Sequence, residues 1–213
     1  MHIHLFSLLL GIVYMALSEG GTCDYSTIPL EQRNYMDYVR EMLKNGTQLF
    51  LKWGFNGPFR NNRTICWTSN KSHALNLGYQ RHERFYNTVA TTSHWQDRET
   101  TYYVGPMNCT PTVMVQARDG GQPDPEVSGN FTLLFATPQC FVMGILGNAS
   151  AQAVDSTQPP TDNSTCQLWA QRHGNHTVKK LCEEAFYSNC SCVEGMYKRG
   201  HDHCNLTEGE GLS

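Results

Sequence analysis

The feature that most constrains the fold is a series of short segments in which apolar residues alternate with polar or small ones. In the first, Leu49, Leu51, Trp53 and Phe55 recur at every second position, which is typical of a strand with one buried face. Seven more segments follow, at Arg63–Thr68, Ala74–Gln80, Arg84–Thr92, Thr100–Gly105, Thr112–Ala117, Asn130–Thr137 and Cys140–Leu146. Eight antiparallel strands on a meandering path predict an all-β, up-and-down barrel, with two packed sheets as the competing arrangement.

Helical segments flank this region. Ser26 or Thr27 can cap a short helix that has Pro29 near its first turn and ends at Asn45-Gly46. After a polar loop over 147–164, Thr165–Ala170 reads as one further strand. A second helix is predicted over His176–Ser188. Its apolar residues recur at helical spacing on one face: Val178, Leu181, Cys182, Ala185 and Phe186.

The N-terminus predicts export. Leu5–Leu17 is almost continuously apolar and is followed by small residues. Because a bilayer span takes about 20 residues, this run reads as a signal peptide over residues 1–20. A short membrane anchor is the alternative. No second apolar stretch of membrane length follows, so we expect a secreted, extracellular chain with no membrane partner.

Nine cysteines are present, and their number is odd. In an oxidising compartment they indicate disulfides rather than metal ligands, and the Cys-x-x-Cys spacing of metal sites is absent. Eight can form four bridges, which leaves one unpaired or bonded to another chain. They are Cys23, Cys66, Cys109, Cys140, Cys166, Cys182, Cys190, Cys192 and Cys204.

Ten Asn-x-Ser/Thr sequons predict a heavily glycosylated surface. The sequons at Asn108 and Asn189 contain a cysteine, so bridge formation can compete with glycosylation there. The asparagines are Asn45, Asn62, Asn70, Asn108, Asn130, Asn148, Asn163, Asn175, Asn189 and Asn205.

Charge and motifs exclude several functions. The formal net charge is −3, which argues against a basic face for nucleic acid. The sequence holds no Gly-x-Ser-x-Gly, no His-Glu-x-x-His and no phosphate loop, so nothing in it indicates an enzyme or a cofactor. His201, His203, His173 and His176 lie in polar segments without a third ligand in phase, and we interpret them as solvated rather than metal-binding.

Three stretches carry a resemblance to a known family: Leu49–Trp67, Asn130–Val142, and Cys166-Gln167-Leu168-Trp169 followed by Leu181-Cys182 and Phe186. Their order and spacing resemble the lipocalins, and more closely the tick salivary lipocalins related to the histamine-binding proteins. The resemblance covers about Leu30 to Cys204. It implies an eight-stranded barrel with a short N-terminal helix and a C-terminal helix packed on its wall, as a domain over 21–192, and a tail over 193–213 partly tethered by a disulfide.

The resemblance also implies two bridges, Cys140–Cys182 and Cys66–Cys204. The other cysteines have no family counterpart. As guesses, we pair Cys109 with Cys166, and Cys23 with Cys190 or Cys192, taking Cys23–Cys190 as the working choice. That leaves one thiol in Cys190-Ser191-Cys192.

An eight-stranded barrel has room for one small ligand. A cationic amine inside it would need buried carboxylates, yet the positions that are acidic in the family's amine binders are Phe141 and Gln167 here. Between residues 47 and 117 the acids are Glu83, Asp97 and Glu99, and we expect all of them at strand ends or in turns. The sequence therefore favours an apolar or weakly polar ligand, such as a fatty-acid-derived mediator or a sterol.

We expect inward-facing aromatic, apolar and amide side chains to line the site. Alternating aromatics also fill any β core, so the prediction depends on the whole set: Trp53, Phe55, Trp67, Phe85, Tyr102, Phe131, Leu133, Phe135, Gln167 and Trp169. The functional expectation is stoichiometric capture of a small host mediator during blood feeding. One alternative is binding of histamine or serotonin. Another is binding of a host protein, such as a complement component or a chemokine, by the outer surface, which a fully packed interior would favour.

Overall fold

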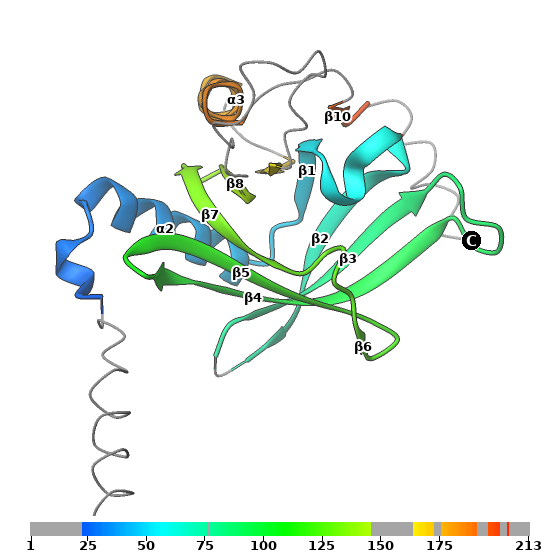
Figure 1. The fold of residues 1–213 in the computed structure, drawn as a ribbon, viewed down its shortest axis with the longest axis horizontal. Coiled ribbons are helices and arrows are strands. Elements are labelled where there is room, and N and C mark those ends of the chain that lie inside the picture. The colour runs from blue at the N-terminus through cyan, green and yellow to red at the C-terminus, as the bar shows by residue number, and fades with distance from the viewer. Residues whose placement is uncertain are drawn as a thin grey trace, which may run out of the picture.

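The barrel closes through the pairing of its first and last strands. The computed structural model describes residues 23–75, 77–145, 164–172, 176–190, 196–200 and 204, so the expected signal peptide lies outside the described residues. Neighbouring strands are antiparallel, and β9 pairs with β1 to complete the ring (Figure 1). The eight barrel strands are β1 (Leu49–Phe55), β2 (Thr64–Ala74), β3 (Tyr79–Asn87), β4 (Trp95–Met107), β5 (Thr110–Asp119), β7 (Gly129–Ala136), β8 (Cys140–Ile145) and β9 (Thr165–Gln171).

The all-β barrel is confirmed, but one expected strand is wrong. The segment Ala74–Gln80 contains the end of β2, the turn and the start of β3, and the segment Arg84–Thr92 is the end of β3 with the turn after it. The apolar residues Leu75 and Leu77 suggested a buried strand here, but both side chains are exposed between β2 and β3. The eighth barrel strand is therefore β9. Two further strands, β6 (Gln122–Pro123) and β10 (Tyr197–Lys198), have two residues each.

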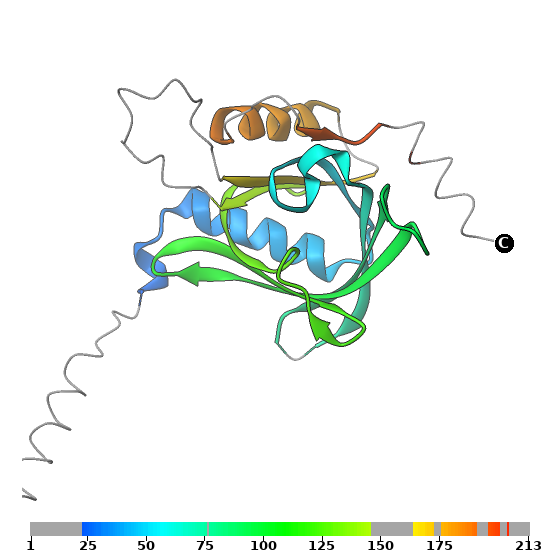
Figure 2. The same cartoon turned by 45° about the vertical axis from the view of Figure 1, so that its right-hand side comes forward.

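The N-terminal helix, α2 (Leu30–Lys44), ends at Asn45 as expected. It starts differently, because Pro29 occupies its N-cap position and Asp24 caps a separate 3₁₀ turn, η1 (Tyr25–Thr27). Its buried residues, Met36, Val39, Met42 and Leu43, join the same core as the inward-facing barrel residues. Figures 1 and 2 show α2 lying across one end of the barrel, which it closes.

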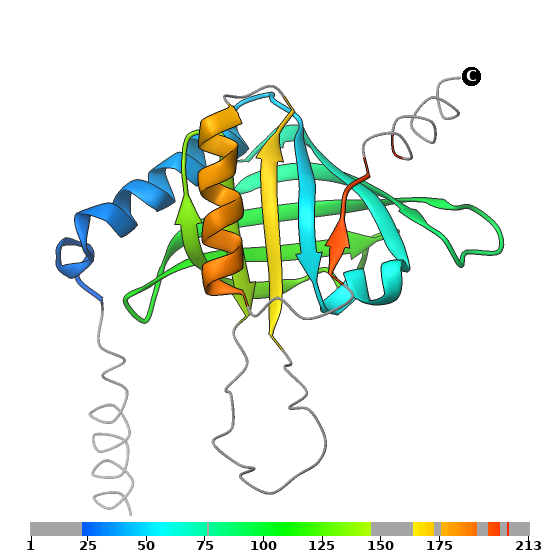
Figure 3. The ribbon, with the colours of Figure 1, turned by 90° about the horizontal axis from the view of Figure 1, so that it is seen from above.

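The C-terminal helix, α3 (His176–Asn189), packs on the outside of the barrel. Figure 3 shows it running alongside β9. Cys182 and Phe186 are fully buried beneath it, whereas Leu181 is exposed. A short 3₁₀ segment, η2 (Gly57–Asn62), folds over the barrel end opposite α2. Neither helix of the described residues is long and apolar enough to cross a membrane.

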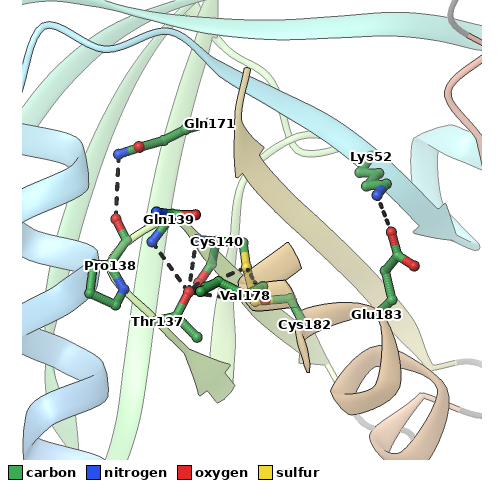
Figure 4. Close-up of a disulfide and its surroundings, with 9 residues drawn as sticks. All are labelled: Lys52, Thr137, Pro138, Gln139, Cys140, Gln171, Val178, Cys182 and Glu183. Atoms are coloured by element: carbon green, nitrogen blue, oxygen red, sulfur yellow. Dashed lines mark hydrogen bonds and ion pairs between the residues drawn. A yellow bond between two sulfur atoms is a disulfide. The ribbon is translucent and has the colours of Figure 1, made fainter. Parts of the chain in front are cut away.

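Four disulfides join the described cysteines. Cys66–Cys204 and Cys140–Cys182 are the two bridges that the family resemblance implies, and the second ties α3 to β8 (Figure 4). The two guessed bridges, Cys109–Cys166 and Cys23–Cys190, are wrong. Cys23 instead bonds Cys109, and Cys166 bonds Cys190.

The barrel geometry explains this correction. Cys23 precedes α2 at the closed end, where the β4–β5 turn carries Cys109. Cys166 lies at the start of β9, beside the C-terminal end of α3 that carries Cys190. The ninth cysteine, Cys192, lies outside the described residues.

Candidate ligand-binding site

Two irregularities in the strands decide which aromatic residues face the barrel interior. The register of β1 against β9 shifts between Leu51 and Trp53, and that of β7 against β8 shifts between Leu133 and Phe135. Because side chains alternate with a period of two, one extra residue moves everything after it to the other face. Gly54 is consequently the inward residue of β1, and a Cβ added to it would lie 2.6 Å from the ring of Phe59.

Three of the expected ligand-lining residues therefore lie on the outer side. Trp53, Phe55 and Phe135 belong to or pack against the outer cluster, the apolar layer between the barrel wall and α3. The Trp53 ring lies 5.6 Å from that of Phe186 on α3. Their expected place inside the barrel is wrong, because sequence alternation alone does not reveal a bulge.

The other seven expected residues are buried on the inner side. Trp67 and Phe85, from β2 and β3, stack with their ring centroids 4.1 Å apart. On β9, the Gln167 side-chain oxygen accepts a hydrogen bond from Trp169 Nε1 at 2.8 Å. The set consists of Trp67, Phe85, Tyr102, Phe131, Leu133, Gln167 and Trp169.

A buried carboxyl group was missed by the sequence analysis. Glu83 lies in the middle of β3, not at a strand end, and is 1% exposed. The Tyr102 hydroxyl donates a hydrogen bond to Glu83 Oε1. Burial raises the pKa of Glu83 to about 7, although this hydrogen bond and the nearby Arg81 charge act to lower it. The side chain is therefore close to half protonated at neutral pH.

The alternation within β3 could have revealed Glu83. Every second residue of β3 is buried, on one face of the strand, whether it is polar or apolar: Arg81, Glu83, Phe85 and Asn87. The other two acids of the census lie in β4 rather than in turns, and both are exposed. Asp97 there pairs with His82 at 2.9 Å. Of these three acids, only Glu83 is buried in the barrel interior.

Arg81 links the interior to the closed end. Its guanidinium is fully buried and donates to Ser69 Oγ at 2.8 Å and to the backbone oxygens of Leu43 and Thr47 at 3.0 Å each. These bonds hold the end of α2 and the start of the first barrel segment against β3. Arg81 is thus committed to the fold, and Glu83 is the ionisable group available to a ligand.

Two adjoining cavities lie along the barrel axis. The inner one has a volume of about 10 Å³, and its walls include Trp67, Glu83, Tyr102, Gln167 and Trp169. The outer one, of about 690 Å³, opens at the end opposite α2. Pro58, Trp67, Val127 and Gln167 form walls of both cavities. The outer cavity is within the range of small-molecule pockets, about 300–1,000 Å³. The inner cavity has room for about one water, which needs about 10–15 Å³.

The outer cavity, called here the outer chamber, has largely polar walls with an apolar portion, and charged residues at its rim. Phe85, Phe131 and Ile145 contribute apolar surface. At the rim, Arg98 forms ion pairs with Asp124 at 2.6 Å and Asp119 at 3.1 Å. The enclosed interior is therefore nearly filled, with room for about one water, and the open space of this fold lies in the outer chamber.

Comparison with known proteins identifies the fold. No protein-family model and no curated protein matches the chain. Among solved structures, apocrustacyanin C1 is similar with a TM-score of 0.53 and 12% identity, covering 87% of this chain and 94% of that one. Apocrustacyanin C2 has a TM-score of 0.50 and 11% identity, covering 82% and 89%. The closed barrel with its two helices is the lipocalin fold, which can hold one small ligand.

A structure of Japanin from Rhipicephalus appendiculatus bound to cholesterol also matches. Its TM-score is 0.49 at 14% identity, with 72% of this chain and 91% of that chain covered. At these identities the comparisons establish the fold alone. The chain therefore has the lipocalin fold, and any ligand must be argued from the cavities.

Proposed function

We propose that the protein is a secreted lipocalin that captures a small host mediator in stoichiometric amounts and thereby suppresses haemostasis, inflammation or immunity. The observation that carries this proposal is the outer chamber of about 690 Å³. It joins an aromatic interior through the shared walls Trp67 and Gln167. A chamber of this size, in which Phe85, Phe131 and Ile145 lie among largely polar walls, suits a ligand that joins an apolar body to polar groups, such as a sterol or a fatty-acid-derived mediator.

Features outside the barrel support export into an oxidising compartment. Four disulfides join eight of the nine cysteines, as expected for an extracellular protein. Sequon asparagines within the described residues lie at the surface, where glycans can be attached. Asn45, Asn62, Asn108, Asn130 and Asn189 are exposed and Asn70 is half-buried; Asn148, Asn163, Asn175 and Asn205 lie outside the described residues. Residues 1–20 would be the signal peptide and 193–213 a tail tethered through Cys204.

Native mass spectrometry of the secreted protein tests the proposal directly. The sample should be deglycosylated but not reduced, so that a retained ligand and the thiol count are read together. Titrations with cholesterol, leukotrienes, histamine and serotonin should then follow the fluorescence of Trp67 and Trp169, which border the inner cavity. One-to-one binding of an apolar member supports the proposal. Absence of binding to every member, with no retained ligand, would overturn it.

Glu83 favours a second candidate, a cationic amine of the histamine or serotonin type. A buried carboxylate among aromatic rings is a suitable partner for an ammonium group. Its pKa of about 7 gives a test, since amine binding needs the ionised carboxylate. Amine affinity should fall as the pH decreases from 8 to 6, and Glu83→Gln should abolish the pH dependence. An apolar ligand should bind almost equally at both pH values.

A further inference from the structure

The indole nitrogen of Trp67 is a buried donor that lacks a hydrogen-bond partner among the described residues. Trp67 is 1% exposed, and its ring is held by stacking on Phe85. Arg33 and Arg84 also have a buried nitrogen without a hydrogen bond, although that of Arg84 lies 3.8 Å from Asp97, and neither side chain borders the inner cavity or the outer chamber. A buried donor is costly when unpaired. At Trp67, a ligand in the barrel can supply the missing acceptor.

Glu83 offers the complementary group at the same cavity. Its side chain and that of Trp67 both border the inner cavity. The Tyr102 hydroxyl donates to one carboxyl oxygen, Oε1. Because a carboxyl group has two oxygens and room for several hydrogen bonds, it can accept a further one. The cavity thus brings together a donor that needs an acceptor and an acceptor that can take another donor.

The size of the inner cavity limits what can satisfy both groups. About 10 Å³ is the space of a single small polar group, whereas the adjoining outer chamber of about 690 Å³ can take a ligand body. Trp67 and Gln167 are walls of both spaces, so the two spaces adjoin at these side chains. A ligand body in the chamber reaches the inner cavity by passing one terminal group between them. We call the inner cavity, with Trp67 and Glu83 as its polar walls, the polar well.

Hydrogen-bond chemistry then distinguishes the terminal groups. An ammonium group donates only, so it would leave the Trp67 donor unpaired. A carboxylate accepts only, so it would be repelled by the ionised form of Glu83 and could bond Glu83 only in its protonated form. A hydroxyl group both donates and accepts. We infer that the polar well selects ligands that carry a hydroxyl group on an apolar body, with Trp67 donating to that oxygen and Glu83 accepting from it. This inference rests on the proposed capture of a small ligand in the barrel.

Matched ligands with one carbon skeleton test the inference. The probes are 1-decanol, decyl methyl ether and decylamine, each measured by displacement of a fluorescent apolar dye from the full secreted protein. At pH 8 the Glu83 carboxyl is mostly ionised, so the amine has its best opportunity to bind. Decanol should bind about tenfold more tightly than the ether, which cannot donate, and more tightly than the amine. Equal binding of decanol and ether, or tighter binding of the amine, would overturn the inference.

Variants separate the hydrogen bonds from simple packing. Trp67→Phe should weaken decanol binding about fivefold more than Trp169→Phe, a matched control whose indole nitrogen already donates to Gln167. Glu83→Gln keeps an acceptor and should change decanol affinity by less than about threefold, whereas Glu83→Leu should weaken it about fivefold or more. Equal effects of the two tryptophan variants would contradict the role of Trp67. If Trp67→Phe does not fold, the Glu83 pair and the ligand series still decide.

The outcomes also separate this inference from the proposed function. Tight binding of some member of the wider ligand panel, without preference for a hydroxyl group in the matched series, would overturn the polar well but leave capture in the barrel standing. Failure of every probe and every panel member would overturn both.

Discussion

The barrel interior and the outer cluster under α3 use similar residues for different purposes. Inside, Trp67 and Phe85 stack beside two cavities, and Glu83 and the Trp67 indole nitrogen retain hydrogen-bonding capacity. Outside, Trp53 and Phe186 lie in an apolar layer crossed by the Cys140–Cys182 and Cys166–Cys190 bridges. Aromatic content alone does not identify the ligand site. The face of the strand on which a ring lies identifies it, so substitutions in the two regions should affect ligand affinity and stability differently.

Removal of a ring should give the largest effect in both regions. Phe186→Ala in the outer cluster should lower the free energy of unfolding by about 3–5 kcal/mol, because Phe186 is fully buried. Phe131→Ala, at a wall of the outer chamber, should cost a comparable amount and also weaken ligand binding. Chemical denaturation and ligand titration of both variants measure this. Loss of affinity in the folded Phe186 variant would contradict the division.

The next largest loss of stability is expected from removal of the Cys140–Cys182 bridge, which ties α3 to β8. Replacing Cys140 and Cys182 together by alanine opens a loop with a sequence separation of 42 residues, and should lower the free energy of unfolding by about 2–4 kcal/mol. Ligand affinity measured well below the melting temperature should remain, since both cysteines lie in the outer cluster. A binding defect without a stability defect would mean that α3 shapes the outer chamber.

The pH dependence of stability should report on the interior. The pKa of Glu83 is raised in the folded protein to about 7 from an ordinary value near 4.5. Between these values the folded state keeps a proton that the unfolded state has lost. The contribution of Glu83 to stability is therefore complete below about pH 4.5 and is lost as the pH rises toward 7, by up to about 1.4 kcal/mol per pH unit.

Melting curves across this range, compared with Glu83→Gln, isolate that contribution. The difference in stability between the native protein and the variant should change with pH in the stated direction. A difference that stays constant from pH 4.5 to 7 would show that Glu83 ionises normally and is accessible to water.

The smallest effect is expected from the ion pair outside the barrel. Lys52 of β1 pairs with Glu183 of α3 (Figure 4), and both side chains are about one-third exposed. Lys52→Met should lower the free energy of unfolding by less than about 1 kcal/mol, because water screens such a pair. Thermal unfolding at low and high salt checks this. A loss above 2 kcal/mol would indicate that the pair, rather than the bridges, holds α3.

Sequence patterns predicted much of the fold because strands and helices can be recognised from the local period of their apolar residues. The alternation around Leu49 and the apolar face around Cys182 marked a strand and a helix correctly. The predictions of inward-facing residues were wrong where the face of a side chain depends on pairing with a neighbouring strand. The shift after Leu51 arises from its pairing with β9, which is far away in the sequence, so Trp53 and Phe55 were assigned to the wrong face.

The candidate site shows the same limit. Gln167 and Trp169 could be chosen as lining residues because they alternate regularly along β9, which has no register shift against β8. Trp67 was chosen correctly although it lies within a register shift of β2. Glu83 could not be chosen, because strands were predicted at Ala74–Gln80 and Arg84–Thr92, which placed Glu83 in a turn between them. In the structure β3 begins at Tyr79, and Glu83 falls on its inward face together with Arg81 and Phe85.

The amino-acid sequence by itself determined the class of fold, the cysteine-rich character and the supply of aromatic side chains, since these follow from composition and local period. Only the tertiary structure decided which aromatics enclose a ligand, which cysteines bond and that one carboxyl group lies inside. The physical reason is that a single bulge reverses the faces of a strand, and that burial and bridge partners depend on segments brought together by closure of the barrel.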